Sequence, residues 1–509
     1  MRSKKAIKNT VYGLIYEAAV MICGFVVPRL ILTSFGSEYN GVTNVITQFL
    51  RVIALFQAGI GGVTLAALYK PLYEKDHEQV SVIKRTTEIY LRKIAFMFIG
   101  VSVIIACTLP LFVKEFDYLF TASLVLIMSL STFAQYFFGQ AHQFLLSADQ
   151  RQRFMHGVNT VKVLANTVIS AIMIKLGFGI HAVMLGSAVV YIIAPLFIYI
   201  YVNDKYALVK TVKPDNNVIN QRWDNFGIEI ANFTTRNSAL IILSIFTNVY
   251  EVSVYSIYYL IMQGIFAIFS PFVNGVSAAF GNMFAKNEQK LLYKNLRLYE
   301  QIVFTLATFL FGVGAVIILP FVNIYVKGVS DVNYIRPMFA YIFLATTFFQ
   351  SIRYPYTGIT VAAGHFRPMR NPAFIEAILN IGISIVLVNK FGIVGVVVGT
   401  LFAYVYRTIR YAVYVSRVVL SRNIMIFIKR IILSLSCIFL IVASGYFLPF
   451  QAITNYLTLI SYVAIISSIA IILIIIIELL FYKDDFQEFM ILLRNIKKNK
   501  TNRSEEIPL

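Results

Sequence analysis

Long apolar runs separated by short polar segments make up most of the chain. A helix needs about 20 consecutive apolar residues to cross the hydrocarbon core of a bilayer, and most of these runs reach or exceed that length. They lie at 9–34, 41–69, 91–113, 118–146, 157–176, 180–202, 226–248, 252–281, 299–321, 337–363, 372–389, 392–416, 428–449 and 456–482. The pattern therefore predicts an all-α integral membrane protein with about 14 transmembrane helices.

The composition agrees with a membrane protein, and the sequence lacks the features of an enzyme. Apolar residues make up 59% of the 509 residues and charged residues 13%, whereas soluble domains contain about 45–50% and about 25%. The longest polar segments, 203–225 and 483–509, are too short to form a catalytic domain. We find no phosphate-binding loop, nucleophile elbow or zinc-protease motif. We therefore expect a protein that is not an enzyme and has no cofactor or metal.

The positive charge is distributed unevenly between the two sides of the predicted membrane. The formal net charge is +20, and 33 of the 44 Lys and Arg residues lie in segments on the side of the N-terminus, against five on the other side. Cytoplasmic loops are rich in Lys and Arg, so both termini are predicted to be cytoplasmic, in a multi-pass protein of the plasma (inner) membrane. The net positive charge is then explained by the basic cytoplasmic segments of a membrane protein, and we expect no nucleic-acid partner.

The sequence contains an internal repeat at an offset of 213 residues. "GGVTLAA" (61–67) aligns with "NGVSAAF" (274–280), and "GIHAVMLGSAVVY" (179–191) aligns with "GIVGVVVGTLFAY" (392–404) at the same offset. The repeat predicts an N-terminal six-helix half at 1–213 and a C-terminal six-helix half at 214–426. Two additional helices at 427–482 and a basic tail at 483–509 follow. Two parallel six-helix repeats around a central cavity form one of the known transporter architectures.

One stretch resembles a known family. "AAGHFRPMRNPAFIEAILNIGISIVLVNKFGIVGVVVGT" (362–400) is similar to the C-terminal signature of the polysaccharide transporter (Wzx-type flippase) family, with support from "FGSEYNGV" (35–42) and "VSVYSIYYLI" (252–261). The superfamily of multidrug, oligosaccharidyl-lipid and polysaccharide exporters also contains the lipid II flippase and the multidrug and toxin extruders. The family often has an acidic residue in the seventh helix, where this chain has Arg236 and Asn237.

The resemblance implies a function and a set of partners. Such proteins move undecaprenyl-diphosphate-linked oligosaccharide from the cytoplasmic to the outer leaflet by alternating access. We therefore expect a monomer that contacts membrane lipids, with glycosyltransferases and a polysaccharide polymerase as partners. A multidrug extruder-like, ion-coupled antiporter and a lipid II flippase are the alternatives. A membrane polymerase or ligase would typically carry a long outward loop, and the longest one here is a connector at 321–336.

Arginines inside the apolar runs are the candidate substrate-binding residues. Arg51 and Arg236 lie about ten residues from the nearest helix end, too deep for their side chains to reach a membrane surface. We expect both to face a cationic cavity that binds the diphosphate, because a guanidinium matches phosphate geometry; the alternative is an ion pair with a buried carboxylate. Arg29 and Arg353 would extend the cavity, and Arg407 and Arg410 are expected to reach the cytoplasmic surface along their own stems.

Acidic residues are the candidates for coupling to an ion. Glu17 and Glu229 occupy nearly equivalent places in the two halves, and either could bind H+ or Na+ or form a static ion pair. Glu376 is interpreted as a helix-end residue. His142 is the one histidine placed where it could line a cavity. The three cysteines show no metal or disulfide spacing, and we expect each to be a small buried side chain.

Overall fold

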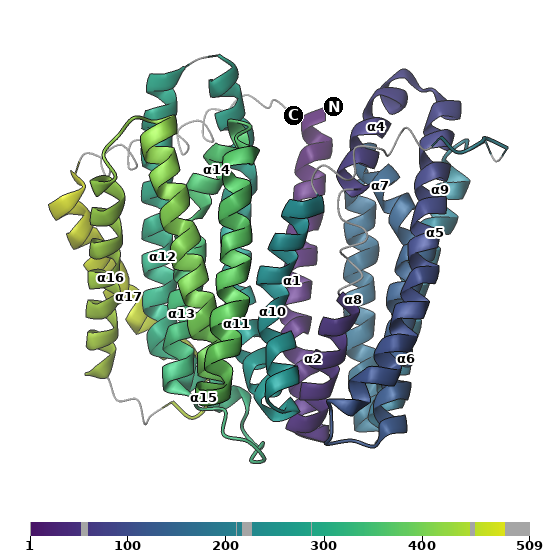
Figure 1. The fold of residues 1–509 in the computed structure, drawn as a ribbon, viewed down its shortest axis with the longest axis horizontal. Coiled ribbons are helices and arrows are strands. Elements are labelled where there is room, and N and C mark those ends of the chain that lie inside the picture. Colours follow the sequence, from purple (N-terminus) through teal and green to yellow (C-terminus); the bar gives the residue numbers. More distant parts are fainter. Residues whose placement is uncertain are drawn as a thin grey trace, which may run out of the picture. The chain divides into compact units, whose positions relative to one another are not determined.

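All regular secondary structure in the described part of the chain is helical. The computed structural model describes residues 2–51, 60–209, 211–215, 226–286, 288–447 and 453–483. Its helices, with two π-helical turns, are α1 (Arg2–Phe35), α2 (Ser37–Arg51), α4 (Ile60–Glu74), α5 (His77–Thr108), α6 (Tyr118–Ala134), η2 (Gln135–Gly139), α7 (Gln140–Ala148), α8 (Gln152–Lys175), α9 (Ile180–Lys205), α10 (Phe226–Phe246), α11 (Val249–Ala285), α12 (Gln289–Tyr325), α13 (Pro337–Ile352), α14 (Tyr354–Ala362), α15 (Phe366–Tyr414), η4 (Val415–Val419), α16 (Met425–Tyr446) and α17 (Tyr456–Phe481) (Figure 1).

The helices confirm the predicted all-α membrane class. Within the described ranges, ten helices are long and apolar enough to cross a bilayer, so the chain is a multi-pass membrane protein, and the exact number of fourteen is not confirmed. Two predicted runs, 372–389 and 392–416, lie in α15, which is interrupted by the non-helical backbone of Gly392 (φ 54°, ψ −131°). The predicted run 337–363 is divided into α13 and α14 at Arg353.

The order of the helices repeats at the offset found in the sequence. The offset between Gly179 and Gly392 also relates α5 to α12, α7 to α14, and α9 to the part of α15 after Gly392. Gly179 precedes the first residue of α9, and its equivalent Gly392 marks the kink in α15. The division into halves at residue 213 stays a prediction.

The chain forms two compact units, which we describe separately. The first contains Met1–Leu260, Gly328–Asn333 and Val388–Ile393; the second contains Ile261–Lys327, Tyr334–Leu387 and Val394–Leu509. In the first unit, α1 packs along α8, and α4, α5, α7 and α9 meet around a core. That core consists of Leu68, Val80, Ile83, Leu145, Leu146, Ala148, Ile198 and Val202.

Polar contacts also fasten α2 within the first unit. Both carboxylate oxygens of Asp331 accept hydrogen bonds from Ser37, one from its backbone N–H at 2.7 Å and one from its hydroxyl at 2.6 Å. Asp331 thus caps the N-terminus of α2, where a negative charge is favourable. Three residues further on, the side-chain amide of Asn40 donates to the hydroxyl of Ser253 at 2.7 Å. These bonds join segments that are far apart in the sequence.

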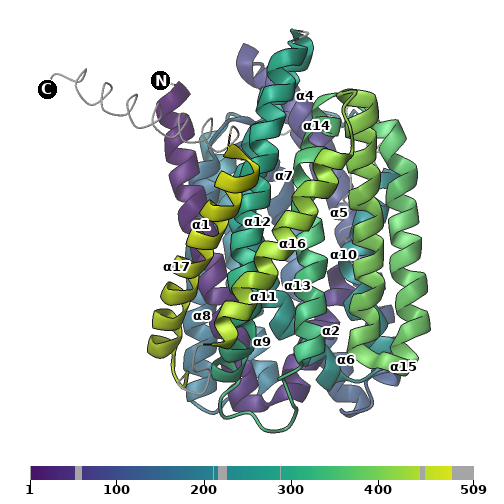
Figure 2. The same cartoon turned by 90° about the vertical axis from the view of Figure 1, so that its left-hand side faces the viewer.

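The second unit is organised around α12. This helix packs against α13, α16 and α17, which run beside it in Figure 2. The apolar residues between α12 and the two C-terminal helices form one buried cluster that includes Val313, Ile441 and Ile466. Asn455 begins α17 with a capping box, in which its side chain accepts a hydrogen bond from the backbone N–H of Thr458 at 2.9 Å.

Gly186 and Gly399 are related by the repeat offset of 213 residues, and each lies close to the preceding helical segment. A Cβ at Gly399 would lie 2.7 Å from the backbone nitrogen of Ser384, whereas a Cβ at Gly186 would meet the sulfur of Met173 at 2.5 Å. Backbone does not yield easily, but a methionine side chain can turn away. We expect G399A to lower the free energy of unfolding by about 1–3 kcal/mol, the usual cost of overpacking. G186A is expected to cost clearly less; equal denaturation midpoints in detergent for both variants would contradict this.

Candidate functional site

The predicted site residues of the first unit occupy different environments. Glu17 is exposed on α1, and its charge acts on His156 of α8. Arg29 is half-buried one residue after Pro28 of the same helix, and Arg51 is the last residue of α2 with an exposed side chain. Of these three, Arg51 is the one arginine with an exposed side chain. The side chains of Glu229 and Arg236, both on α10, lie outside the described residues.

Arg353 belongs to a buried ion network in the second unit. It lies at the junction of α13 and α14, and its guanidinium donates to Glu376 of α15 at 2.7 Å. The other carboxylate oxygen of Glu376 accepts a hydrogen bond from Arg407, which also donates to the hydroxyl of Tyr411 at 3.4 Å. Glu376 has no exposed surface. One buried carboxylate therefore partly neutralises two arginines.

This network corrects two expectations from the sequence. Glu376 is not a helix-end residue, because it lies inside α15 and is fully buried between two guanidinium groups. Arg407 does not extend to the surface, since only 8% of the residue is exposed and its charge is paired with Glu376. Arg410 is exposed, and its reach to the cytoplasmic surface stays a prediction. Cys107 is exposed, and only Cys23 and Cys437 are buried.

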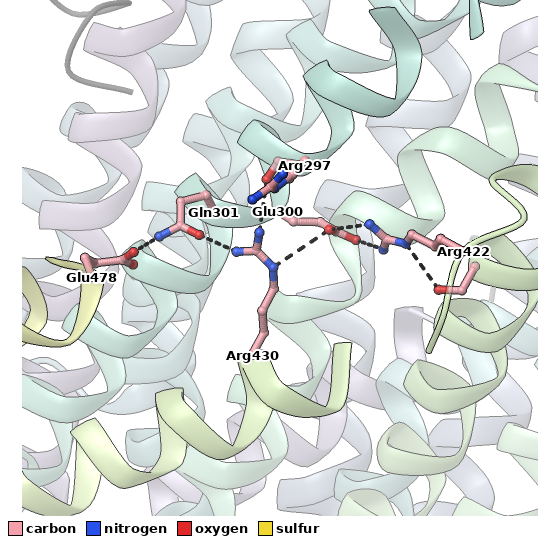
Figure 3. A network of polar contacts seen from close by, with 7 residues as sticks. Arg297, Glu300, Gln301, Arg422, Arg430 and Glu478 are labelled. Atoms are coloured by element: carbon pink, nitrogen blue, oxygen red, sulfur yellow. Dashed lines mark hydrogen bonds and ion pairs between the residues drawn. The ribbon is translucent and has the colours of Figure 1, made fainter. Parts of the chain in front are cut away.

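A second buried network joins α12 to the segment that follows α15 and to α16 (Figure 3). Glu300 on α12 accepts two hydrogen bonds from the guanidinium of Arg422, one of them at 2.9 Å, in the bidentate arrangement that makes such pairs strong. The Nε of Arg430 on α16 lies 3.9 Å from the same carboxylate. The exposed fractions of these side chains are 0% for Glu300, 4% for Arg422 and 2% for Arg430.

The same network continues to α17. Arg430 donates to the side-chain oxygen of Gln301, and the Gln301 amide donates to Glu478. Glu478 also accepts a hydrogen bond from the hydroxyl of Thr305 at 2.7 Å. Figure 3 shows this row of side chains running from Arg422 to Glu478. A small cavity lies beside it, lined by polar groups of Gln301, Arg430 and Glu478 and by apolar residues of α16 and α17. The row attaches both C-terminal helices to α12.

The first unit has its own charged cluster on α5. Glu88 accepts a charged hydrogen bond from Lys84 at 3.0 Å and another from Arg92 at 2.6 Å, one turn before and one turn after it. Only 5% of the Glu88 side chain is exposed. The guanidinium of Arg92 also stacks on the ring of Phe137 in η2, 4.7 Å from its centre. Beside this cluster lies His142 of α7, whose ring is affected by all three charges.

A polar cluster outside the spans connects the α7–α8 turn to the linker after α9. Tyr206 donates a hydrogen bond to Asp149 at 2.6 Å, and Arg151 lies 2.7 Å from the same carboxylate. Burial and then the contact with Asp149 raise the pKa of Tyr206 well above its usual value. The linker continues along α5, where the backbone N–H of Val209 donates to Ser81 at 2.9 Å. The start of the linker is therefore held against the first unit.

Sequence reasoning missed most of these buried charges, and the cause is local. The apolar runs were predicted to begin at residues 91, 299 and 428, but α5, α12 and α16 begin at His77, Gln289 and Met425. In α5 the extra turns carry the buried charges of Lys84 and Glu88, which looked like loop residues. Glu300 and Arg430 lie only one or two residues inside the runs that begin at 299 and 428, where they looked like residues of a solvated helix end. The spacing of Lys84, Glu88 and Arg92, four residues apart each time, is the signal that could have identified the first cluster.

Known structures share this fold, although no family model and no curated protein sequence matches the chain. A structure of the lipid II flippase MurJ in an inward closed conformation has a TM-score of 0.72 and 14% identity, covering 93% of this chain and 99% of that chain. An inward-facing multidrug resistance MATE family transporter of the MOP superfamily has a TM-score of 0.57 and 12% identity, covering 79% and 95%. A MOP superfamily transporter from Pyrococcus furiosus, described by the reverse polarity of its binding pocket, has a TM-score of 0.54 and 14% identity, covering 82% and 96%. The chain therefore has the fold of the transporters and flippases of the MOP superfamily.

Proposed function

We propose that this protein is a flippase for undecaprenyl-diphosphate-linked oligosaccharide, the repeat unit of a polysaccharide. The headgroup would pass from the cytoplasmic to the outer leaflet of the plasma membrane by alternating access. The observation that carries the proposal is the fold shared with a lipid II flippase over 93% of this chain. Both termini would be cytoplasmic, as the 33 to 5 distribution of Lys and Arg predicts.

The charges of the chain favour an anionic ligand. A polyprenyl diphosphate needs a cationic path, and an arginine can bind phosphate through two parallel hydrogen bonds. In the proposal, Arg29, Arg51, Arg236 and Arg353 line this path. Arg353 is already paired with Glu376, so it would bind a phosphate only in exchange for this carboxylate. Arg51, exposed at the end of α2, would bind without such an exchange.

The two alternatives differ in substrate. The MATE neighbours share the fold, and a multidrug extruder-like antiporter would carry organic cations, which an arginine-lined path repels. A lipid II flippase would carry the same diphosphate with a different saccharide, and the fold shared with MurJ fits both substrates. Coupling to H+ or Na+, a monomeric state, and glycosyltransferases and a polymerase as partners also belong to the proposal.

A flipping assay with three substrates separates these possibilities. The purified protein would be reconstituted into liposomes that contain fluorescent undecaprenyl-diphosphate oligosaccharide, fluorescent lipid II or, inside the vesicles, ethidium. We expect protein-dependent loss of protection from an impermeant quencher for the oligosaccharide lipid, under an imposed H+ or Na+ gradient. Faster movement of lipid II would assign the protein to that substrate. Efflux of ethidium without movement of either lipid would overturn the proposal.

A further inference from the structure

His142 is buried without the hydrogen bonds that a buried imidazole normally makes. Only 1% of the residue is exposed, and neither ring nitrogen has a hydrogen-bond partner among the described residues. The carbonyl of Phe138, one turn earlier, lies beside the ring but without hydrogen-bond geometry. Leaving a polar group unpaired in the interior costs free energy, and most buried polar side chains avoid it.

The groups shown at the ring come from α5 and α9. Lys84, Glu88 and Arg92 of α5 are the charges that act on it. Tyr199 of α9 meets the ring edge-on, with 5.0 Å between the ring centres. Helices α4 and α8 also pack against α7: Leu68 of α4 lies in the same apolar core as Leu145 of α7, and Met155 of α8 accepts a hydrogen bond from the hydroxyl of Ser147.

The net positive charge of this cluster opposes protonation of His142. Lys84 and Arg92 share one carboxylate, Glu88, and Arg85 lies 3.9 Å from the same carboxylate, so the four charges sum to +2 while the ring is neutral. A protonated His142 would raise the sum to +3 in a place with little water, where like charges repel strongly. The ring is therefore neutral in the packed arrangement. Protonation of the ring shifts the equilibrium toward arrangements in which the ring reaches water or faces Glu88 without the neighbouring cations.

The segment before His142 has an irregular helix that could permit such a movement. The π-helical turn η2 (Gln135–Gly139) ends directly before α7. A π-helical turn accommodates one extra residue, and such turns occur frequently at functional sites. Conversion to regular α-helix would rotate α7 relative to α6 and change the direction in which His142 points. The equivalent place in the second repeat is also irregular, because α13 ends and α14 begins at Arg353.

We propose that His142 is a proton-binding site and that its protonation is linked to movement of α7 away from the charged cluster on α5. This inference deepens the proposed transport function, since it names the residue through which H+ would drive the cycle. Glu88 is the group that would stabilise the protonated ring, and in the packed arrangement its carboxylate is paired with Lys84 and Arg92. The ligand of this site is a proton alone, and no other group is transferred.

A measurement without substrate tests the linkage. Hydrogen–deuterium exchange of η2 and α7 would be followed in the full chain in nanodiscs at pH 7.5 and pH 5.5, with correction for the intrinsic exchange rate. One linked proton changes the ratio of open to packed molecules by up to tenfold per pH unit, and an open-state imidazole of ordinary proton affinity gives about tenfold over this interval. We expect acid to speed exchange in the wild type but not in H142Q. H156Q, which removes a histidine of α8, should retain the acid response.

A second variant separates proton binding from a structural role. R92Q removes one cation that opposes protonation in the packed arrangement, so the proton affinities of the packed and open arrangements become more similar and acid should speed exchange by a smaller factor than in the wild type. Loss of packing alone would speed exchange by the same factor at both pH values and leave the acid response unchanged. An unchanged acid response in H142Q would overturn the inference. An acid response that depends on His142, in a protein that flips no polyprenyl diphosphate, would keep the proton site and reject the proposed function.

Discussion

Replacement of Glu300 by Gln should destabilise the protein by about 3–5 kcal/mol, the usual cost when one partner of a buried ion pair is removed. The change leaves the buried guanidinium of Arg422 without its bidentate carboxylate and removes the nearest negative charge from Arg430. Because these residues connect α12 with α16, we expect the C-terminal helices to detach first. The free energy of unfolding would be measured in mixed micelles as the fraction of denaturing detergent is raised.

An exposed ion pair of the same chain serves as the control. Glu74 lies 3.9 Å from Lys70, and its side chain is 52% exposed. Such pairs contribute about 0–1 kcal/mol, so E74Q should unfold nearly as the wild type does. The double variant of Glu300 and Arg422 should also lose less stability than the sum of the single variants, because it leaves no unpaired charge from this pair. Equal stability of E300Q and E74Q would show that the network contributes no more than a surface pair.

The fold was predictable because the membrane leaves few options for the backbone. A bilayer requires each spanning backbone group to be hydrogen-bonded within its own helix, so apolar run length alone identifies the helices. The separate runs 372–389 and 392–416 predicted a break between them, and the structure places the kink of α15 at Gly392. The break at Arg353 was not predicted, because the run 337–363 is apolar on both sides of it.

The candidate site was less predictable, because charged residues near the ends of the apolar runs looked solvated although several of them are buried. Burial of a charge was inferred from its position inside an apolar run, and this rule identified Arg353 but not its partner. Glu376 lies near the polar start of its run, so it resembled a residue at a solvated helix end. The structure shows that helices begin before their apolar runs and pack against each other there. Which charges are buried in such turns depends on contacts between helices, which a single sequence does not contain.

The arginines that bind the substrate should be those that no carboxylate neutralises. Arg353 and Arg407 share Glu376, and Arg422 is paired with Glu300. A guanidinium held by a buried carboxylate must break that pair before it can bind a phosphate, and the exchange recovers little free energy. Among the four arginines predicted to line the path, we therefore choose Arg51, whose side chain the structure describes as exposed, for a test of headgroup binding.

Replacement of Arg51 by Ala should weaken headgroup binding by roughly 1.5–3 kcal/mol, the contribution of hydrogen bonds to a charged group. This free energy corresponds to about a 10- to 150-fold higher dissociation constant. The side chain is exposed at the end of α2, so the change should leave stability nearly unaltered. R51K should restore binding only in part, because a single ammonium group does not reproduce the two parallel bonds of a guanidinium. Binding would be measured with a soluble diphosphate-linked saccharide by calorimetry in nanodiscs.

The control for this experiment is Arg410, and the structure excludes Arg407 from that role. Arg410 is exposed on α15, whereas Arg407 is buried against Glu376, so R407A would test stability rather than binding. We expect R410A to bind the saccharide as the wild type does. The affinity of R51A should also depend less on ionic strength than that of the wild type, since one charge contact with the diphosphate is missing. If R51A and R410A bound equally well at low salt, Arg51 would have no part in headgroup recognition, and the cationic path would have to be sought among Arg29 and Arg236.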